Sequence, residues 1–161
     1  MNRTNLAFAL LVVGSLAVGG AAAAAHVDDL RTLDAAGDVR ERLSVSVERA
    51  AVEDGRLLVW VTVHNPSERT VSLRGASFRL ARGETLRVAS GAGRRLDDNG
   101  TAVPAGGRLT ARYAVSIAPD AVEDARDALD GGARLAVRLS LRLEDTPFDH
   151  VSESPVGGEG T

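Results

Sequence analysis

The feature that most constrains the fold of this chain is an alternation of apolar and polar residues with a period of two. It is clearest from Ala133 to Glu144, where the apolar positions are Leu135, Val137, Leu139, Leu141 and Leu143. Successive side chains of a β-strand point to opposite faces of the sheet, so this pattern predicts a strand with one buried face. A chain built from such strands must bury their apolar faces against a second layer.

Similar but less regular runs precede this stretch, at residues 43–52, 56–64, 71–73, 77–81, 85–90 and 108–118. Asp54 and Gly55 separate the first two runs, which is a strong hairpin signal. Short strands at this spacing are typical of a sandwich. We therefore predict an all-β fold, an immunoglobulin-like β-sandwich of about seven strands with one short helix before the last strand.

The predicted helix follows residue 118. Asp120 and Glu123 have the spacing of a capping box, and Gly131 stands where a helix ends. Trp60, the only tryptophan, is expected in the core or beneath this helix.

The N-terminal segment of residues 6–25 carries no charge, and Arg3 is the only basic residue before it. Such a segment is an export signal or a membrane anchor. The small residues near its end favour cleavage after Ala23 or Ala25, and the rest of the chain is exported in either case. The predicted organisation is a signal peptide or anchor at 1–25, a linker or stem at 26–41, the sandwich at 42–145 and a flexible tail at 146–161.

Composition excludes several kinds of site. The chain has no cysteine, so it has no disulfide, no thiolate metal site and no cysteine nucleophile. Its Lys and Arg positions are all arginine, and its net charge of −3 is too small to imply a polyanion partner, so no nucleic-acid partner is predicted. The use of arginine alone, with abundant Ala, Gly and Val, resembles haloarchaeal proteins or proteins of other GC-rich genomes.

No motif in the sequence assembles a reaction centre. His26, His64 and His150 lack the spacing of metal ligands, and no G-x-S-x-G motif is present. The glycine-containing segment at residues 91–95 has two arginines but lacks the third glycine of a dinucleotide fingerprint, which favours a flexible loop. We therefore predict no catalytic residue, no metal and no cofactor.

Two surface features remain as candidate sites. Asn99 begins an N-x-T sequon in an exposed turn, which predicts glycosylation in an exported protein, while Ca²⁺ binding by Asp97, Asp98 and Asn99 is a weaker alternative. A second candidate is an anion-binding face formed by arginines of the last predicted strand, which Arg108 and Arg112 of a neighbouring strand could extend: Arg134, Arg138 and Arg142. The alternative for these arginines is a solvated face with cross-strand ion pairs.

The order of these segments resembles a known family. A valine-rich strand ends in Asn65-Pro66, and strands at 71–75 and 77–81 follow. A loop with Pro104, Gly106 and Gly107 then leads into a long alternating strand that ends at Ile117, before the helix and last strand. This order is similar to the late-embryogenesis-abundant type 2 family, also called the water-stress or WHy domain. Related immunoglobulin-like domains of archaeal cell surfaces share the pattern. Either resemblance implies a stress-linked or surface role without an agreed catalytic site.

The sequence therefore predicts an exported non-enzymatic β-sandwich with a structural, interaction or stress-protective role at the cell surface. The alternative is an extracytoplasmic module that binds an anion or a glycan on its arginine-rich face. Expected partners are a protein or another cell-surface component, and a membrane through residues 6–25. The predicted location is secreted, or anchored at the outer face of the cytoplasmic membrane.

Overall fold

A computed structural model describes residues 34–82 and 86–157 of the chain. The predicted signal peptide or anchor and half of the predicted linker, residues 26–33, lie outside these residues. The chain divides into two units, Met1–Gly37 and Asp38–Thr161, and the sandwich belongs to the second. In the described part of the predicted linker, residues 34–42 are helical.

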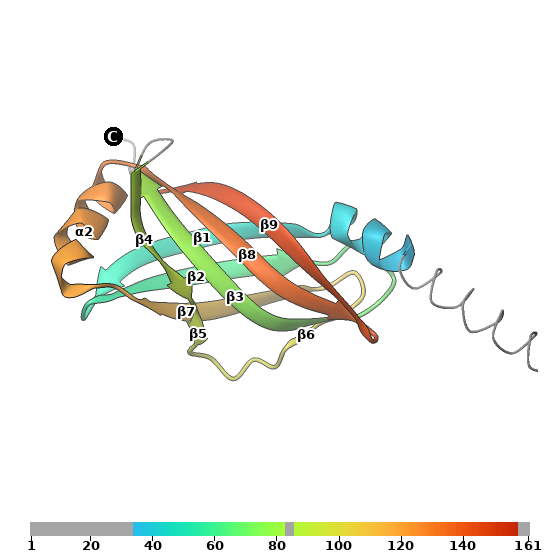
Figure 1. Cartoon of the computed structure of the whole chain (residues 1–161). Coiled ribbons are helices and arrows are strands. Elements are labelled where there is room, and N and C mark those ends of the chain that lie inside the picture. Colours follow the sequence, from blue (N-terminus) through green and yellow to red (C-terminus); the bar gives the residue numbers. More distant parts are fainter. Residues whose placement is uncertain (1–33, 83–85, 158–161) are drawn as a thin grey trace, which may run out of the picture. The chain divides into compact units, whose positions relative to one another are not determined.

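Two antiparallel sheets form the sandwich (Figure 1). The first, here called the β2 sheet, has the strand order β1-β2-β7-β5, and the second, the β8 sheet, has the order β4-β3-β8-β9, with β6 paired to β3. The strands of the β2 sheet are β1 (Ser44–Glu53), β2 (Arg56–His64), β5 (Arg94–Arg95) and β7 (Arg108–Ser116). Those of the β8 sheet are β3 (Val71–Arg82), β4 (Leu86–Ala92), β6 (Ala102–Val103), β8 (Ala133–Leu143) and β9 (Thr146–Val156).

The core lies between the sheets and consists of the residues that alternate inward. The largest side chains that are less than 2% exposed are those of Leu57, Leu80, Leu135, Leu139, Leu141 and Leu143. Burial of each leucine stabilises the fold by about 1.5–3 kcal/mol, which explains why the period-two pattern dominates the sequence. The prediction of an all-β sandwich with one short helix is confirmed.

Strand β3 is one long strand, whereas the sequence predicts two short ones divided at Gly75. Its pairing with β8 shifts by one residue between Leu73 and Gly75. This bulge lets the strand continue across the glycine. Odd-numbered residues face the core before the bulge, and even-numbered residues face it afterwards.

The chain passes from one sheet to the other at Gly93, between β4 and β5. The N–H of Gly93 donates to the carbonyl of Ala76, 2.9 Å away. A Cβ at this position would lie 2.4 Å from Phe78 Cε2, so only glycine fits. The loop expected at residues 91–95 is instead a crossing point packed on aromatic rings.

The helix α2 (Val122–Asp130) follows a 3₁₀ turn, Pro119–Ala121, and lies at one end of the sandwich (Figure 1). Its buried residues are Ala125, Ala128 and Leu129. The predicted capping box is wrong, because Asp120 lies in the 3₁₀ turn and no side chain caps the N-terminus at Ala121. Gly131 follows the last helical residue, where the sequence places the helix end, but the glycine with a positive φ is the next one, Gly132.

Strand β9 occupies residues that the sequence predicts as a flexible tail, so the helix precedes the last two strands. It pairs with β8 along its whole length, from Thr146 opposite Leu143 to Val156 opposite Ala133. On its core-facing side, Ser152 Oγ donates to the carbonyl oxygen of Val45 in β1, 3.0 Å away. This contact joins the edge strands of the two sheets. The strand escaped prediction because its outward residues include two prolines and two acids, which hide the alternation.

Among the described residues, no helix has the length and apolar character needed to cross a membrane.

Candidate functional site

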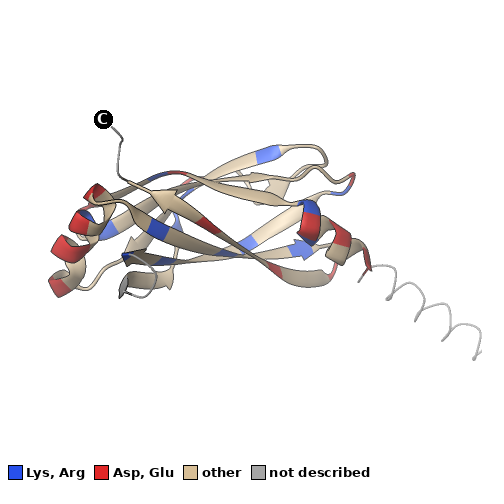
Figure 2. Ribbon diagram, turned by 90° about the horizontal axis from the view of Figure 1, so that it is seen from above, with Lys and Arg blue, Asp and Glu red and all other residues tan. Residues whose placement is uncertain are grey.

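Basic and acidic residues concentrate on different elements of this fold: arginines on the central strands, and acids on helix α2. The central strands β2, β3, β7 and β8 contain one, three, two and three arginines respectively and no acidic residue. Helix α2, in contrast, contains Glu123, Asp124, Asp127 and Asp130 beside one arginine. Figure 2 shows this separation, with α2 largely red and blue segments along the strands. Both outer sheet faces are therefore rich in guanidinium groups.

The predicted anion-binding residues lie on the outer face of β8. Arg142 Nη2 is 3.0 Å from Asp145 Oδ1, in an exposed ion pair. Arg134 and Arg138 make no ion pair with any described residue. The three predicted arginines therefore differ, since one is partly neutralised and two keep their full charge toward solvent.

A further arginine completes this group from strand β3. Arg79 lies opposite Ala136, and the neighbouring pairs are Ser77 with Arg138 and Ala81 with Arg134. Arg79 therefore lies between the two arginines of β8 on the same face. Sequence reasoning missed it, because the pairing of β3 with β8 depends on the bulge before Gly75.

A shallow hollow of about 320 Å³ lies beside these residues. Its lining includes Ser77, Arg79, Arg138 and Val151. Val151 is 58% exposed, which is unusual for a large apolar side chain. The hollow thus combines two guanidinium groups, a hydroxyl group and an apolar wall.

The expected extension of this face by Arg108 and Arg112 is wrong. Both lie on β7, which belongs to the β2 sheet, and β7 pairs with β2 and β5. They therefore face away from the β8 arginines, on the other side of the sandwich.

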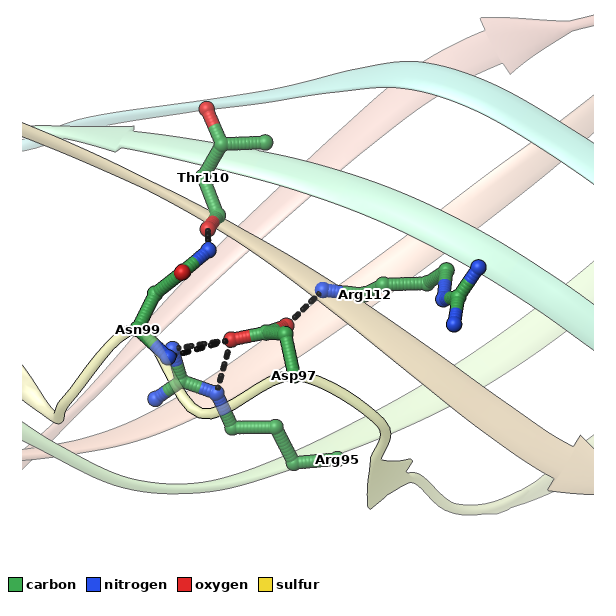
Figure 3. A network of polar contacts seen from close by, with 5 residues as sticks. All are labelled: Arg95, Asp97, Asn99, Thr110 and Arg112. Atoms are coloured by element: carbon green, nitrogen blue, oxygen red, sulfur yellow. Dashed lines mark hydrogen bonds and ion pairs between the residues drawn. The ribbon is translucent and has the colours of Figure 1, made fainter.

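Asp97 forms a polar network at the edge of the β2 sheet (Figure 3). Its Oδ1 accepts hydrogen bonds from Arg95 Nε at 3.0 Å and Nη2 at 2.7 Å, and its Oδ2 accepts from the backbone N–H of Arg112. Burial raises the pKa of Asp97, but the hydrogen bonds and the charge of Arg95 outweigh it, so that the pKa lies below 3.8. The carboxylate therefore holds the 95–99 segment against β7.

Asn99 belongs to the same turn. Its backbone N–H donates to Asp97 Oδ1 at 3.3 Å, and its side-chain amide donates to the carbonyl of Thr110 at 3.4 Å (Figure 3). The residue is exposed, which is compatible with glycosylation. Glycosylation of Asn99 stays a prediction. The hydrogen bonds to both oxygens of Asp97 compete with the Ca²⁺ alternative, which stays untested. Among the described residues, no three His, Asp or Glu side chains are grouped to hold a metal.

Asn65 forms a second network, which sequence reasoning did not predict. Its side chain is fully buried, and its Nδ2 donates to the carbonyl oxygens of Arg69, Val103 and Pro104 at 2.7, 3.2 and 3.1 Å. Its Oδ1 accepts from Ser67 Oγ at 2.6 Å and from the Ser67 backbone N–H at 3.2 Å. The amide thus joins the turn after β2 to the loop before β7. The Asn-Pro pair at a strand end was the available signal.

The two described histidines lie in different sheets. His64 ends β2, opposite Arg108, and His150 lies on β9. The Nδ1–H of His150 donates to the carbonyl of Arg40, 3.3 Å away, and burial lowers the pKa of the ring. His26 lies outside the described residues.

Trp60 lies on the outer face of the β2 sheet, where its side chain is half-buried. The neighbouring Val59 and Val61 are fully buried and point inward. The expectation that Trp60 fills the core or lies beneath the helix is therefore wrong.

Comparison with known proteins gives likeness in fold alone. No family model matches the chain, and no curated protein matches its sequence. Solved structures with a similar fold include a protein from Archaeoglobus fulgidus, 12% identical, with a TM-score of 0.45 over 73% of this chain and 98% of that one. A protein described as a candidate late embryogenesis abundant (LEA) protein is 17% identical, with a TM-score of 0.42 over 84% of this chain and 86% of that one. A protein from Arabidopsis thaliana is 15% identical, with a TM-score of 0.42 over 70% and 74%.

Proposed function

We propose that this chain is an exported, non-enzymatic β-sandwich domain with a structural, interaction or stress-protective role at the cell surface. The observation that supports it most is the use of the polar side chains inside the domain. The buried polar residues Asn65 and Ser67 are bonded to each other and to backbone groups, and no buried side-chain N or O of the described residues lacks a partner. Polar groups inside the fold therefore act in stability, and the groups available to a partner lie on the surface.

The experiment that tests this proposal separates cells of the native host into medium, membrane and cytosol. Intact-mass analysis then gives the first residue of the chain in each fraction. We expect a chain that begins near residue 24 or 26 in the medium, or the full-length chain in the membrane fraction. Full-length protein in the cytosol alone would contradict export. A mass excess that disappears on replacing Asn99 with Gln would place a glycan there.

A second candidate function is supported by the hollow on the β8 sheet. Arg79 and Arg138 line it without an ion pair to a described residue, and the hollow is large enough for one phosphate, sulfate or carboxylate group. Guanidinium groups bind such oxyanions in bidentate geometry. This candidate makes the chain a small-anion-binding module.

NMR of the arginine side chains tests this second candidate. On titration with sulfate, the Nε–H signals of Arg79 and Arg138 should shift together and saturate. The Nε–H signal of Arg126, which lies among the acids of α2, serves as the control and should not move. Equal, unsaturated shifts of all three signals would indicate a general salt effect and exclude the site.

A further inference from the structure

The outer face of the β2 sheet carries a second arrangement of arginines, which is built around an aromatic ring. Trp60 lies at the middle of β2, opposite Arg49 of β1 on one side and Arg112 of β7 on the other. The central carbon of the Arg49 guanidinium is 5.0 Å from the centre of the Trp60 ring, and that of Arg112 is 6.0 Å away. Three neighbouring strands thus place two cations on one indole.

These two cations are not neutralised by the domain. Neither Arg49 nor Arg112 forms an ion pair with a described residue, and both are exposed. A cation–π contact at an exposed site is worth about 0.5–1 kcal/mol and orients the guanidinium group without cancelling its charge. The N–H groups at the rim of each guanidinium therefore remain available to an oxyanion.

More arginines extend this arrangement along the sheet. The strand pairs place Arg108 beside His64 at one end, Arg112 beside Trp60 in the middle, and Arg56 beside Ser116 at the other end. These positions are four residues apart in register, or about 13 Å at a rise of about 3.3 Å per residue. Between them, Thr62 Oγ1 and Thr110 Oγ1 form a hydrogen bond of 2.9 Å. Glu53 of β1 lies opposite Arg56 at one end of this face. The rest is a row of cations and hydroxyls with one indole at its centre, here called the Trp60 row.

We propose that the Trp60 row binds an acidic polysaccharide, a chain of sugar rings that carry carboxylates. A carboxylate of the polymer binds the guanidinium groups of Arg49 and Arg112, and its sugar ring contacts the part of the Trp60 side chain that these two groups leave exposed. Carboxylates further along the polymer bind Arg108 and Arg56. Charge complementarity and the spacing of the arginines carry this inference, because a row about 26 Å long suits a polymer.

A single-stranded nucleic acid fits the Trp60 row less well. Proteins that bind single strands stack successive bases on several aromatic side chains. The outer faces of β1, β2 and β7 present one aromatic residue, Trp60. This inference rests on one part of the proposed function, that the chain acts by binding a partner. Its site lies on the opposite sheet from Arg79 and Arg138.

The only tryptophan of the chain makes the experiment direct, since its fluorescence reports on the proposed contact. The probe is a polygalacturonate oligosaccharide that is long enough to reach from Arg108 to Arg56. Its methyl ester keeps the sugar rings and removes the charges, so it serves as the matched ligand control. At an ionic strength of about 0.1 M, where charges are screened beyond about 10 Å, we expect a saturable change in Trp60 emission with polygalacturonate. We expect binding of the ester to be weaker by about tenfold or more.

Two double variants with the same change in net charge locate the site. Arg49→Gln with Arg112→Gln should weaken polygalacturonate binding by about tenfold or more, since two charge-assisted contacts are lost. Arg79→Gln with Arg138→Gln, on the other sheet, should change it by less than about twofold. Trp60→Leu should also weaken binding when affinity is measured by calorimetry, with thermal unfolding as the check that this variant is folded.

Several results would overturn the proposal. Equal weakening by both double variants would show general attraction of a polyanion. Loss only in Arg79→Gln with Arg138→Gln would favour the anion site on the β8 sheet instead. Tighter binding of oligothymidylate than of polygalacturonate would assign the face to nucleic acid, and self-association that depends on Arg112 would assign it to a second copy. No emission change with polygalacturonate would refute the Trp60 contact itself.

Discussion

Asn65 Nδ2 lies 3.2 Å from the carbonyl oxygen of Val103, so one buried amide connects the end of β2 to strand β6. Further bonds from the same side chain reach Arg69 and Pro104, and the backbone N–H of Asn65 donates to the carbonyl of Gly107 at 2.9 Å. Two turns at one end of the sandwich therefore depend on a single side chain.

We expect Asn65→Ala to lower the free energy of unfolding by about 2–4 kcal/mol, because the carbonyls of Val103 and Pro104 lose the Asn65 donor, and the Ser67 hydroxyl keeps only its bond to the Arg69 carbonyl. Urea unfolding at neutral pH measures this change. Asn99→Ala is the matched control, since Asn99 is exposed, and it should cost less than about 1 kcal/mol. Similar losses in the two variants would show that the Asn65 bonds contribute little.

Gly93→Ala should destabilise the domain by about 1–3 kcal/mol, because the new methyl group overlaps the ring of Phe78. Thermal unfolding gives the change. Gly75→Ala, in the strand β3 that also carries Phe78, provides the control, because its Cβ would meet nothing within 4 Å. That variant should be neutral, or more stable by about 0.5 kcal/mol. A neutral Gly93→Ala would mean that Phe78 and Tyr113 move aside without cost.

The lowered pKa of Asp97 predicts that the stability of the domain falls in acid. Its folded-state pKa lies below the ordinary 3.8, so the stability that its charge contributes is complete above 3.8 and is lost as the pH falls through the folded value. Asp97→Asn should therefore be less stable than wild type at neutral pH, by about 1–3 kcal/mol, and should approach it in acid. Denaturant unfolding across this pH range measures the difference. A constant difference at all pH values would contradict the role of the charge.

Titration of His150 also makes the domain less stable as the pH falls, at a higher pH than titration of Asp97 does. Burial lowers the pKa of its ring from 6.5, so protonation favours the unfolded chain. The stability linked to His150 is complete above 6.5 and is lost as the pH falls through the folded value. His150→Gln should remove this part of the pH dependence and leave that of Asp97. NMR titration of the ring checks the direction, and a midpoint above 6.5 would contradict it.

The sequence predicted what depends on local periodicity. Leu135, Leu139 and Leu143 alternate regularly because they fill the core, and the same rule located most strands. The hairpin at Asp54-Gly55 was also predicted, since both residues adopt a positive φ in the turn, 47° and 69°. Short-range chemistry was therefore sufficient for the fold class.

Features that depend on pairing between distant strands were not predictable. Arg79 lies on the same face as Arg134 and Arg138 only because β3 pairs with β8 through a bulge. Arg112 lies on the opposite face of the sandwich, because β7 belongs to the other sheet. Trp60 was assigned to the core because large aromatic residues are usually buried, whereas it lies half-buried on the outer face, where two arginines contact its ring. Strand β9 was missed because Pro147 and Pro155, both outward-facing, are typical of a loop.

The two long sides of the sandwich differ in how they are joined, and this has a consequence for how the domain opens. At Gly93 a continuous backbone passes from one sheet to the other, so that side cannot separate without breaking strand pairing. On the opposite side, β1 and β9 meet as edge strands, with the Ser152 side chain bonded to Val45. Transient separation of the layers should therefore start at β1 and β9, and amide protons there should exchange with solvent before those of β2, β3, β7 and β8.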